Sequence, residues 1–160
     1  MAFELLYGTY DSTLDEKGRV IIPAALRERY RGQLVVTQGF PLSVLIMLPE
    51  VWQKFLDKLE RQGGGLDTEK YGVLERLYIL PARIAEIDKN TGRIPIVPTV
   101  RTYAGIVNKK CLVMSAENRL EIWDSQYYYD YLKENRDVIR EATNKIGSRL
   151  FKFDAEEGEA

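Results

Sequence analysis

The stretch GRVIIPAALR, residues 18–27, has a near copy, GRIPIVPTVR, at residues 92–101. When Arg19 is placed on Arg93, the preceding glycines and the closing arginines coincide as well. Self-similarity of this kind is the signature of a repeated structural unit. The chain is therefore expected to consist of two related halves.

The repeat continues along each half. LVVTQG (34–39) corresponds to CLVMSA (111–116), and VLIMLPEVWQKFL (44–56) corresponds to LEIWDSQYYYDYL (120–132). Short apolar runs with β-branched residues are typical of core strands, and PAALRERYR, which starts at Pro23, is typical of a short helix. Each half is expected to read turn, strand, short helix, strand, strand, helix.

A charged turn opens each repeat, and the first is LDEKGRVIIP, residues 14–23. The polar DEKG separates two β-rich runs, as in a hairpin. Gly18 suits a backbone position with positive φ, and Asp15 can accept hydrogen bonds from the amides of its own turn. Asp15 can also form an ion pair that holds the Arg19 side chain in place.

The second turn, IDKNTGRIPIVP (87–98), departs from the first. Asp88 precedes Arg93 by five residues rather than four, so this turn is one residue longer. Pro95 lies inside the returning strand, where it removes one ladder donor and predicts an edge or a bulge. The sequence thus keeps Arg93 but leaves its orientation open.

Helices are expected between the repeats and after them. PEVWQKFLDKLER (49–61) carries an apolar stripe at helical spacing, and Asp67 or Thr68 can cap a second helix that ends near Pro81. A last long helix is expected at roughly residues 124–150. We interpret the aromatic and aliphatic stripes of all these helices as core or subunit packing.

These elements predict four parts. They are repeat 1 at residues 5–54, linking helices at 55–81, repeat 2 at 82–126, and a C-terminal helix with an acidic tail at 127–160.

Composition excludes several classes of function. Histidine is absent and Cys111 is the single cysteine, which removes nucleophile schemes based on histidine, disulfides within the chain and the commonest metal ligands. We interpret Cys111 as a small buried hydrophobe. No stretch approaches about 18 consecutive apolar residues, and no signal peptide is evident, so a cytoplasmic location is expected. The net charge is −1, with acidic residues concentrated in the closing DAEEGEA.

The repeated pattern resembles the MraZ family of the swapped-hairpin AbrB group. The resemblance rests on GTYDSTLDEKGRVIIPAALRE, with a DxxxR signature from Asp15 to Arg19, on the repeat itself, and on the RLEIW strand. It implies an α+β fold that is mostly β: a pseudo-dimer of tandem AbrB-like (double-ψ, swapped-hairpin) β-barrel halves with flanking helices. It also implies a nucleoid-associated transcription regulator, and not an enzyme, that binds repeated promoter elements of the division and cell-wall gene cluster.

The resemblance also implies partners and a site. The partners are double-stranded promoter DNA and further copies of the chain, which assemble in a ring. No membrane, small-molecule substrate, metal or cofactor is expected as a partner. The implied DNA-contacting residues are Lys17, Arg19, Lys89 and Arg93. The supporting residues are Asp15, Gly18, Asp88 and Gly92.

Physical chemistry gives these residues roles. A two-stranded β-ribbon fits the major groove, and arginine pairs bidentately with guanine, which predicts base readout by Arg19 and phosphate contact by Lys17. Weak binding by one subunit would gain from many linked sites in a ring.

Other interpretations remain open. Asp15 and Arg19 could merely brace a surface hairpin. Salt bridges or subunit contacts are favoured for Arg27, Arg29, Arg31 and Arg101. The whole chain could instead be a ring-forming interaction scaffold or an antitoxin-like module. An enzyme is the weakest of these hypotheses, because no phosphate-binding loop or metal-ligand spacing accompanies the carboxylates.

Overall fold

The computed structural model describes residues 7–107 and 110–153. The acidic tail at 154–160 and residues 5 and 6 of the first predicted repeat lie outside the described residues. The chain divides into two compact units, Met1–Ser125 and Gln126–Ala160. The first unit contains both repeats except for the helix that ends the second one.

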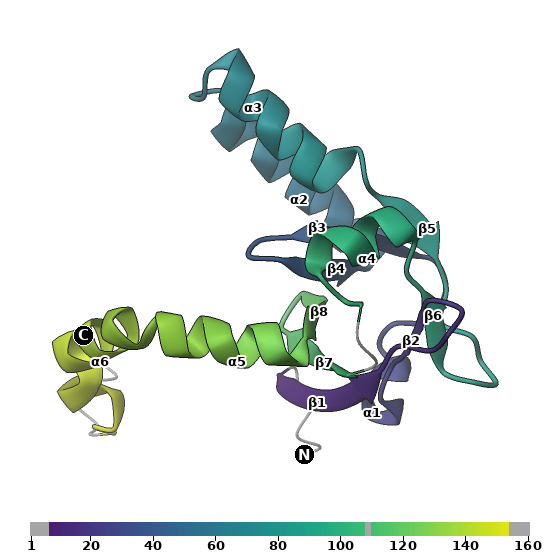
Figure 1. The fold of residues 1–160 in the computed structure, drawn as a ribbon. Coiled ribbons are helices and arrows are strands. Elements are labelled where there is room, and N and C mark those ends of the chain that lie inside the picture. Colours follow the sequence, from purple (N-terminus) through teal and green to yellow (C-terminus); the bar gives the residue numbers. More distant parts are fainter. Residues whose placement is uncertain (1–6, 108–109, 154–160) are drawn as a thin grey trace. The chain divides into compact units, whose positions relative to one another are not determined.

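The two repeats contain the same elements in the same order (Figure 1). The first contains β1 (Gly8–Thr13), β2 (Arg19–Ile21), α1 (Ala24–Arg27), β3 (Leu34–Gly39), β4 (Ser43–Met47) and α2 (Pro49–Gly63). The second contains β5 (Arg83–Ala85), β6 (Arg93–Pro95), α4 (Pro98–Ala104), β7 (Lys110–Ala116), β8 (Arg119–Asp124) and α5 (Ser125–Glu134). The predicted order of strand, short helix, strand, strand and helix is therefore confirmed in both halves.

The repeats exchange strands instead of folding side by side. The six-stranded antiparallel sheet has the order β1-β7-β8-β4-β3-β5. Its edge strand β1 from the first repeat pairs with β7 of the second, and β5 from the second repeat pairs with β3 of the first. In the middle of the sheet β4 pairs with β8, again across the repeats. Each half thus completes the sheet of the other.

The strands that follow the charged turns form a separate two-stranded ribbon, β2 with β6. In this ribbon Val20 lies opposite Ile94, and both side chains are fully buried. Because side chains alternate along a strand, the neighbouring Arg19 and Arg93 lie on the other, outer face. Val20 and Ile94, which correspond to each other in the repeat, are thus also direct cross-strand partners at the centre of the ribbon.

One hydrophobic core joins the ribbon to the sheet. It contains residues from the ribbon, from α1 and α4, and from one face of β3, β4, β7 and β8, among them Val20, Ile94, Ile46 and Ile122. The helix α4 packs on β3 and β4, so a helix of the second repeat covers strands of the first. Cys111 is fully buried in this core, as predicted.

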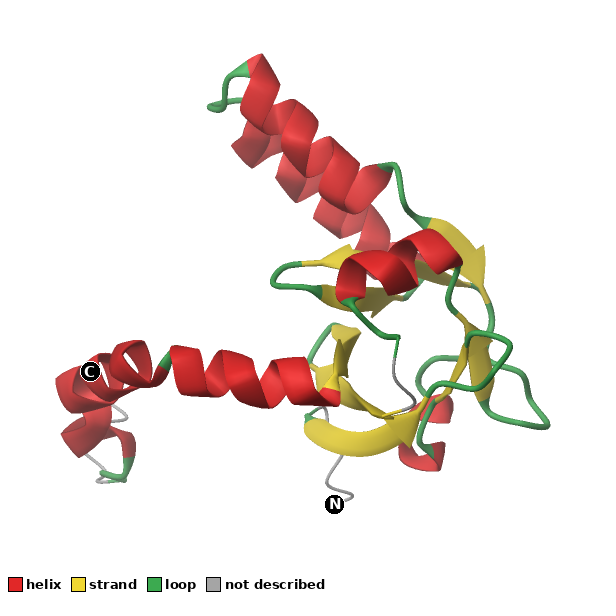
Figure 2. Cartoon of the chain, viewed as in Figure 1, coloured by secondary structure: helices red, strands yellow, loops and turns green. Residues whose placement is uncertain are grey.

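Two parts of the predicted fold class need correction. The protein is a mixed α/β protein and not mostly β, because helices occupy more of the described chain than strands do (Figure 2). The described strands form an open sheet and a ribbon, in which β1 and β5 are unconnected edges, so these pairings show no closed barrel. The tandem repeat and the antiparallel sheet are confirmed.

In the linking segment, Asp67 caps the second helix, as the sequence predicted. The side chain of Asp67 accepts a hydrogen bond from the amide of Lys70 at 2.8 Å and caps α3 (Thr68–Leu74). A π-helical turn, η1 (Glu75–Ile79), follows directly. Its carbonyls accept hydrogen bonds from Thr37 and Gln38 of β3, which anchors the linking segment to the sheet. The predicted boundaries after residues 54 and 126 fall inside α2 and α5.

The single long helix predicted at the C-terminus is wrong. The segment contains two helices, α5 and α6 (Arg136–Leu150), with Asn135 between them at φ −97° and ψ 15°. The side-chain amide of Asn135 donates to the carbonyl of Tyr131 at 2.8 Å. The backbone amide of Asn135 also donates to Tyr131, and that of Ile139 donates to Asn135, so the break is a local change of backbone angles at Asn135. The apolar residues Ile139, Ile146 and Leu150 of α6 are about half exposed.

Candidate nucleic-acid interface

The first charged turn is organised by the carboxylate of Asp15. Its Oδ1 accepts hydrogen bonds from the backbone amides of Lys17 at 3.0 Å and Arg19 at 2.9 Å. The backbone closes the same turn, because the amide of Asp15 donates to the carbonyl of Arg19 and the amide of Gly18 donates to the carbonyl of Asp15. Gly18 has φ of +77°, which favours glycine, as predicted.

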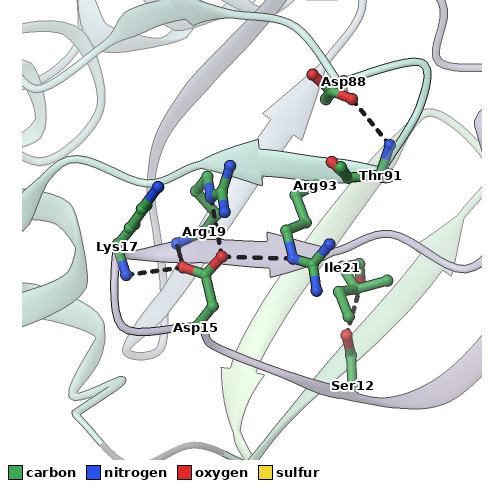
Figure 3. Close-up of polar contacts among 8 residues, drawn as sticks. All are labelled: Ser12, Asp15, Lys17, Arg19, Ile21, Asp88, Thr91 and Arg93. Atoms are coloured by element: carbon green, nitrogen blue, oxygen red, sulfur yellow. Dashed lines mark hydrogen bonds and ion pairs between the residues drawn. The ribbon is translucent and has the colours of Figure 1, made fainter.

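Arginines from both repeats meet at this carboxylate (Figure 3). The Nε of Arg19 donates to Asp15 Oδ2 at 2.8 Å. The Nε of Arg93 lies 3.4 Å from the same oxygen, an ion-pair distance, but is not aligned as a hydrogen bond. About a third of each arginine side chain is exposed. The two turns therefore form one composite site and not two independent copies.

The environment of Asp15 favours its charged form. Partial burial acts to raise its pKa, but the hydrogen bonds from the backbone and side chain of Arg19, the positive charge of Arg19 and the amide of Lys17 outweigh it. The net effect holds the pKa of Asp15 below its usual value. The carboxylate thus stays ionised and can hold both guanidinium groups near neutral pH.

The second turn uses its aspartate differently. Asp88 Oδ1 accepts from the backbone amides of Asn90 at 2.9 Å and Thr91 at 2.8 Å, and no ion pair with Arg93 occurs among the described residues. The amides of Thr91 and Asn90 lower the pKa of Asp88, with a smaller contribution from the charge of Arg19. Like Asp15, Asp88 therefore caps its own turn, but in the described part of the chain it does not share its carboxylate with an arginine.

A groove runs beside the composite site. Its volume is about 1110 Å³, and its cationic lining residues are Arg19, Arg27, Arg31, Lys89 and Arg93. The acidic lining residues are Glu28, Glu86 and Asp88. Lys89 is exposed at the groove, and Lys17 is exposed on the first turn but does not line it. The structure thus brings three of the four predicted contact residues to one groove.

Sequence reasoning missed one residue that supports the site. The hydroxyl of Ser12, on β1, donates to the carbonyl of Ile21 at the end of β2 (Figure 3). This bond ties the ribbon to the edge strand of the sheet. A serine in a β-rich run gives no sequence signal for such a contact, because its partner is a backbone carbonyl nine positions away.

The four flanking arginines divide into two groups. Arg31 forms the expected salt bridge, with Glu28, at 2.7 Å. Arg27 and Arg101 instead donate from Nε to the backbone carbonyls of Ile22 and Ile96, at 2.7 and 2.8 Å.

Arg29 donates to the carbonyl of Glu117 and lies over the ring of Tyr30. Salt bridging is therefore confirmed for Arg31, while the other three arginines hydrogen-bond to backbone carbonyls.

The protein is thus a tandem repeat whose halves exchange strands and whose charged turns meet at one ribbon that carries Arg19 and Arg93. The family model described as "MraZ protein, putative antitoxin-like" matches residues 5–65 and 79–150. The chain belongs to the MraZ family, as the resemblance predicted. No helix within the described ranges is long and apolar enough to cross a membrane.

Individual relatives agree with this family. The chain is 37% identical over 141 residues to the transcriptional regulator MraZ of Treponema denticola, covering 88% of this chain and 96% of the relative. It is 35% identical over 140 residues to the protein of the same name from Ligilactobacillus salivarius, covering 86% and 95%. The similarity to that of Symbiobacterium thermophilum is 31% over 140 residues, covering 88% and 99%. The name of these relatives describes regulators of transcription and not enzymes.

Proposed function

We propose that this protein is a sequence-specific DNA-binding regulator of transcription that inserts the β2–β6 ribbon and its turns into duplex DNA. The observation that carries the proposal is the convergence of Arg19 and Arg93 on Asp15 at the outer face of the ribbon. A two-stranded ribbon fits the major groove, and arginine matches the guanine edge. The name carried by the relatives supports the same function.

In this proposal the residues have different tasks. Arg19 reads a base edge, since Asp15 engages its Nε and leaves the outer guanidinium nitrogens for a ligand. Arg93 contributes a second guanidinium on the same face, and Lys17 and Lys89 contact phosphate. The remaining supporting residues, Gly18, Asp88 and Gly92, shape the turns.

Assembly supplies the affinity that one chain lacks. With a net charge of −1, one chain offers few cations to the phosphates, whereas several copies in a ring would bind neighbouring repeats of a promoter together. The half-exposed Ile139, Ile146 and Leu150 of α6 support assembly, because a lone chain leaves them in water. We place the promoter at the division and cell-wall gene cluster and the protein in the cytoplasm, at the nucleoid.

The proposal keeps the predicted parts of the chain. Residues 5–54 and 82–126 are the two AbrB-like repeats, with residues 55–81 linking them and 127–160 following. The exchange of β1 and β5 between the repeats supports a swapped-hairpin relationship.

A gel-shift experiment tests the function. The wild-type protein is expected to shift a fragment from upstream of its own gene, and deletion of the promoter repeats one at a time should weaken the shift stepwise. Arg19→Ala should abolish the shift without changing the circular dichroism spectrum or the assembly state. Arg61→Ala, which removes an exposed arginine of α2, is the matched control. An Arg19→Ala protein that binds like the wild type would remove Arg19 from the site.

The second candidate is an antitoxin-like or scaffold protein with a protein partner. The description of the family model includes the words "antitoxin-like", and this second function therefore also needs a test. Affinity purification from native cells distinguishes the two functions. A stoichiometric protein partner without promoter DNA would support this candidate against DNA binding.

A further inference from the structure

Arg27 connects its own repeat to the turn of the other repeat. Its Nε donates to the carbonyl of Ile22 at 2.7 Å, and the amide of Ile22 donates to the carbonyl of Gly92 at 2.8 Å. The guanidinium of Arg27 lies directly against the Cα of Gly92, where it fills the space that a Cβ would need. Ile22 therefore holds Gly92 through its amide and Arg27 through its carbonyl, and Arg27 covers the same glycine.

The second repeat contains the same arrangement in the opposite direction. Arg101 Nε donates to the carbonyl of Ile96 at 2.8 Å, and the amide of Ile96 donates to the carbonyl of Gly18 at 3.0 Å. A Cβ on Gly18 would lie 2.7 Å from Cζ of Arg101. We name these two groups the Gly92 clamp (Arg27, Ile22, Gly92) and the Gly18 clamp (Arg101, Ile96, Gly18).

Both glycines differ from the other positive-φ glycines of the described chain. Gly18 and Gly92 are buried, with φ of +77° and +70°. Gly32 and Gly105 have similar φ values, but a Cβ on either would meet nothing within 4 Å. Among the positive-φ glycines that the structure describes, those of the two charged turns are thus the ones that an arginine approaches closely.

We propose that Arg27 and Arg101 are positioning residues that act across the repeats: Arg27 sets the turn that presents Lys89 and Arg93, and Arg101 sets the turn that presents Lys17 and Arg19. This inference rests on the proposed DNA-binding function only for its effect on affinity. The crossed arrangement makes the position of each turn depend on a helix from the other half.

The contacts of Arg27 and Arg101 support a role in positioning the turns. The Nε of each is engaged by a backbone carbonyl, and the flat face of each guanidinium covers a buried glycine. Arg101 does not line the groove that contains Arg19 and Arg93, although it occupies the repeat position equivalent to Arg27, which does. Lining the groove is therefore not a role that Arg27 and Arg101 share. Both of them do contact the turn of the opposite repeat.

Hydrogen exchange of the full-length assembled protein tests the crossed dependence. Arg27→Met and Arg101→Met keep an unbranched apolar stem and remove the guanidinium. For Arg101→Met, exchange of the amides in residues 15–19 should accelerate about tenfold while residues 88–93 keep the wild-type rate. For Arg27→Met the two segments should exchange roles. Acceleration in the turn of the same repeat, in both turns equally, or in neither would overturn the proposal.

Two further variants complete this experiment. Arg31→Met removes a cation from the same groove without touching either glycine, so both turns should keep their exchange rates. If a methionine variant does not fold, Arg27→Lys or Arg101→Lys replaces it, because lysine can donate to the isoleucine carbonyl but has no flat group to cover the glycine. The lysine variants should show the same crossed acceleration, and wild-type rates in them would contradict the proposal.

Salt dependence of DNA binding separates positioning from contact. Arg101→Met and Arg27→Met should weaken binding to the promoter fragment about tenfold and leave the slope of log K against log salt unchanged. A slope reduced by about 0.9 in either variant would identify that arginine as a phosphate contact and overturn its positioning role. Failure of the wild-type protein to bind DNA would refute the proposed function alone, since hydrogen exchange still decides the clamps.

Discussion

At the scale of single residues, one carboxylate controls two cations from different repeats. Asp15 lies 2.8 Å from Arg19 Nε and 3.4 Å from Arg93 Nε, while Asp88 caps its own loop. Both aspartates accept hydrogen bonds from amides of their own turn, but among the described residues only Asp15 also forms ion pairs with the arginines. Orientation of both arginines therefore depends on Asp15.

Replacement of each aspartate by asparagine tests this difference. Asp15→Asn should reduce the ratio of promoter to unrelated-DNA affinity about tenfold, because both guanidinium groups lose the carboxylate that orients them. Asp88→Asn makes the same change in charge and should alter the ratio less than about twofold. Titrations of both DNAs at one salt concentration measure the ratio, and equal effects of the two variants would refute a composite site.

At the scale of elements, each turn is restricted by its backbone and by its neighbour. Gly18 and Gly92 combine positive φ with an arginine in contact, whereas Gly32 has positive φ in open space. Left-handed backbone at a residue other than glycine costs about 1–2 kcal/mol, and overpacking adds about 1–3 kcal/mol. Gly18 and Gly92 should therefore tolerate substitution less well than the polar sequence of their turns suggests.

Replacement of these glycines by alanine distinguishes the cost of the left-handed backbone from the cost of overpacking against the arginine. Gly18→Ala should lower the free energy of unfolding by more than Gly32→Ala, which carries the backbone cost alone. The additional loss should shrink when Gly18→Ala is combined with Arg101→Ala and persist when it is combined with Arg27→Ala. Urea unfolding of these variants gives the values. If Gly18→Ala cost no more than Gly32→Ala, the contact with Arg101 would be too loose to position the turn.

At the scale of the whole molecule, the repeats share one core and should unfold together. Cys111 of β7 is fully buried between β1 of the first repeat and β8 of the second. Burial raises the pKa of its thiol to about 12, and the charge of Asp124 acts in the same direction. The thiolate that reacts with disulfide reagents is therefore scarce in the folded state.

Thiol labelling reports on this shared core. In the native protein at pH 8, Cys111 should resist an aromatic disulfide reagent for hours, and labelling in urea should follow the same transition as tryptophan fluorescence. Rapid labelling before that transition would show that β1 and β7 separate locally, and the repeats would then not be one cooperative unit.

Much of the local structure was predictable from the sequence. The repeat predicted the order of elements in both halves, and the polar turns flanking β-rich runs predicted Gly18, Asp15 and their hydrogen bonds, because these depend on residues close together in the chain. The prediction of a mostly β protein failed because a resemblance in strands says little about how much helix lies between and after them. The break at Asn135 was missed because a stripe of apolar residues continues across it.

Two copies of one unit, each with a charged turn, could be inferred from the residues alone, since a turn is set by local backbone preferences and short-range hydrogen bonds. The pairing of β2 with β6, the approach of Arg93 to Asp15 rather than Asp88, and the cover of each turn glycine by Arg27 or Arg101 of the other repeat depend on the folded chain. These contacts join residues far apart in the chain, and their geometry follows from how the two halves bury one shared core.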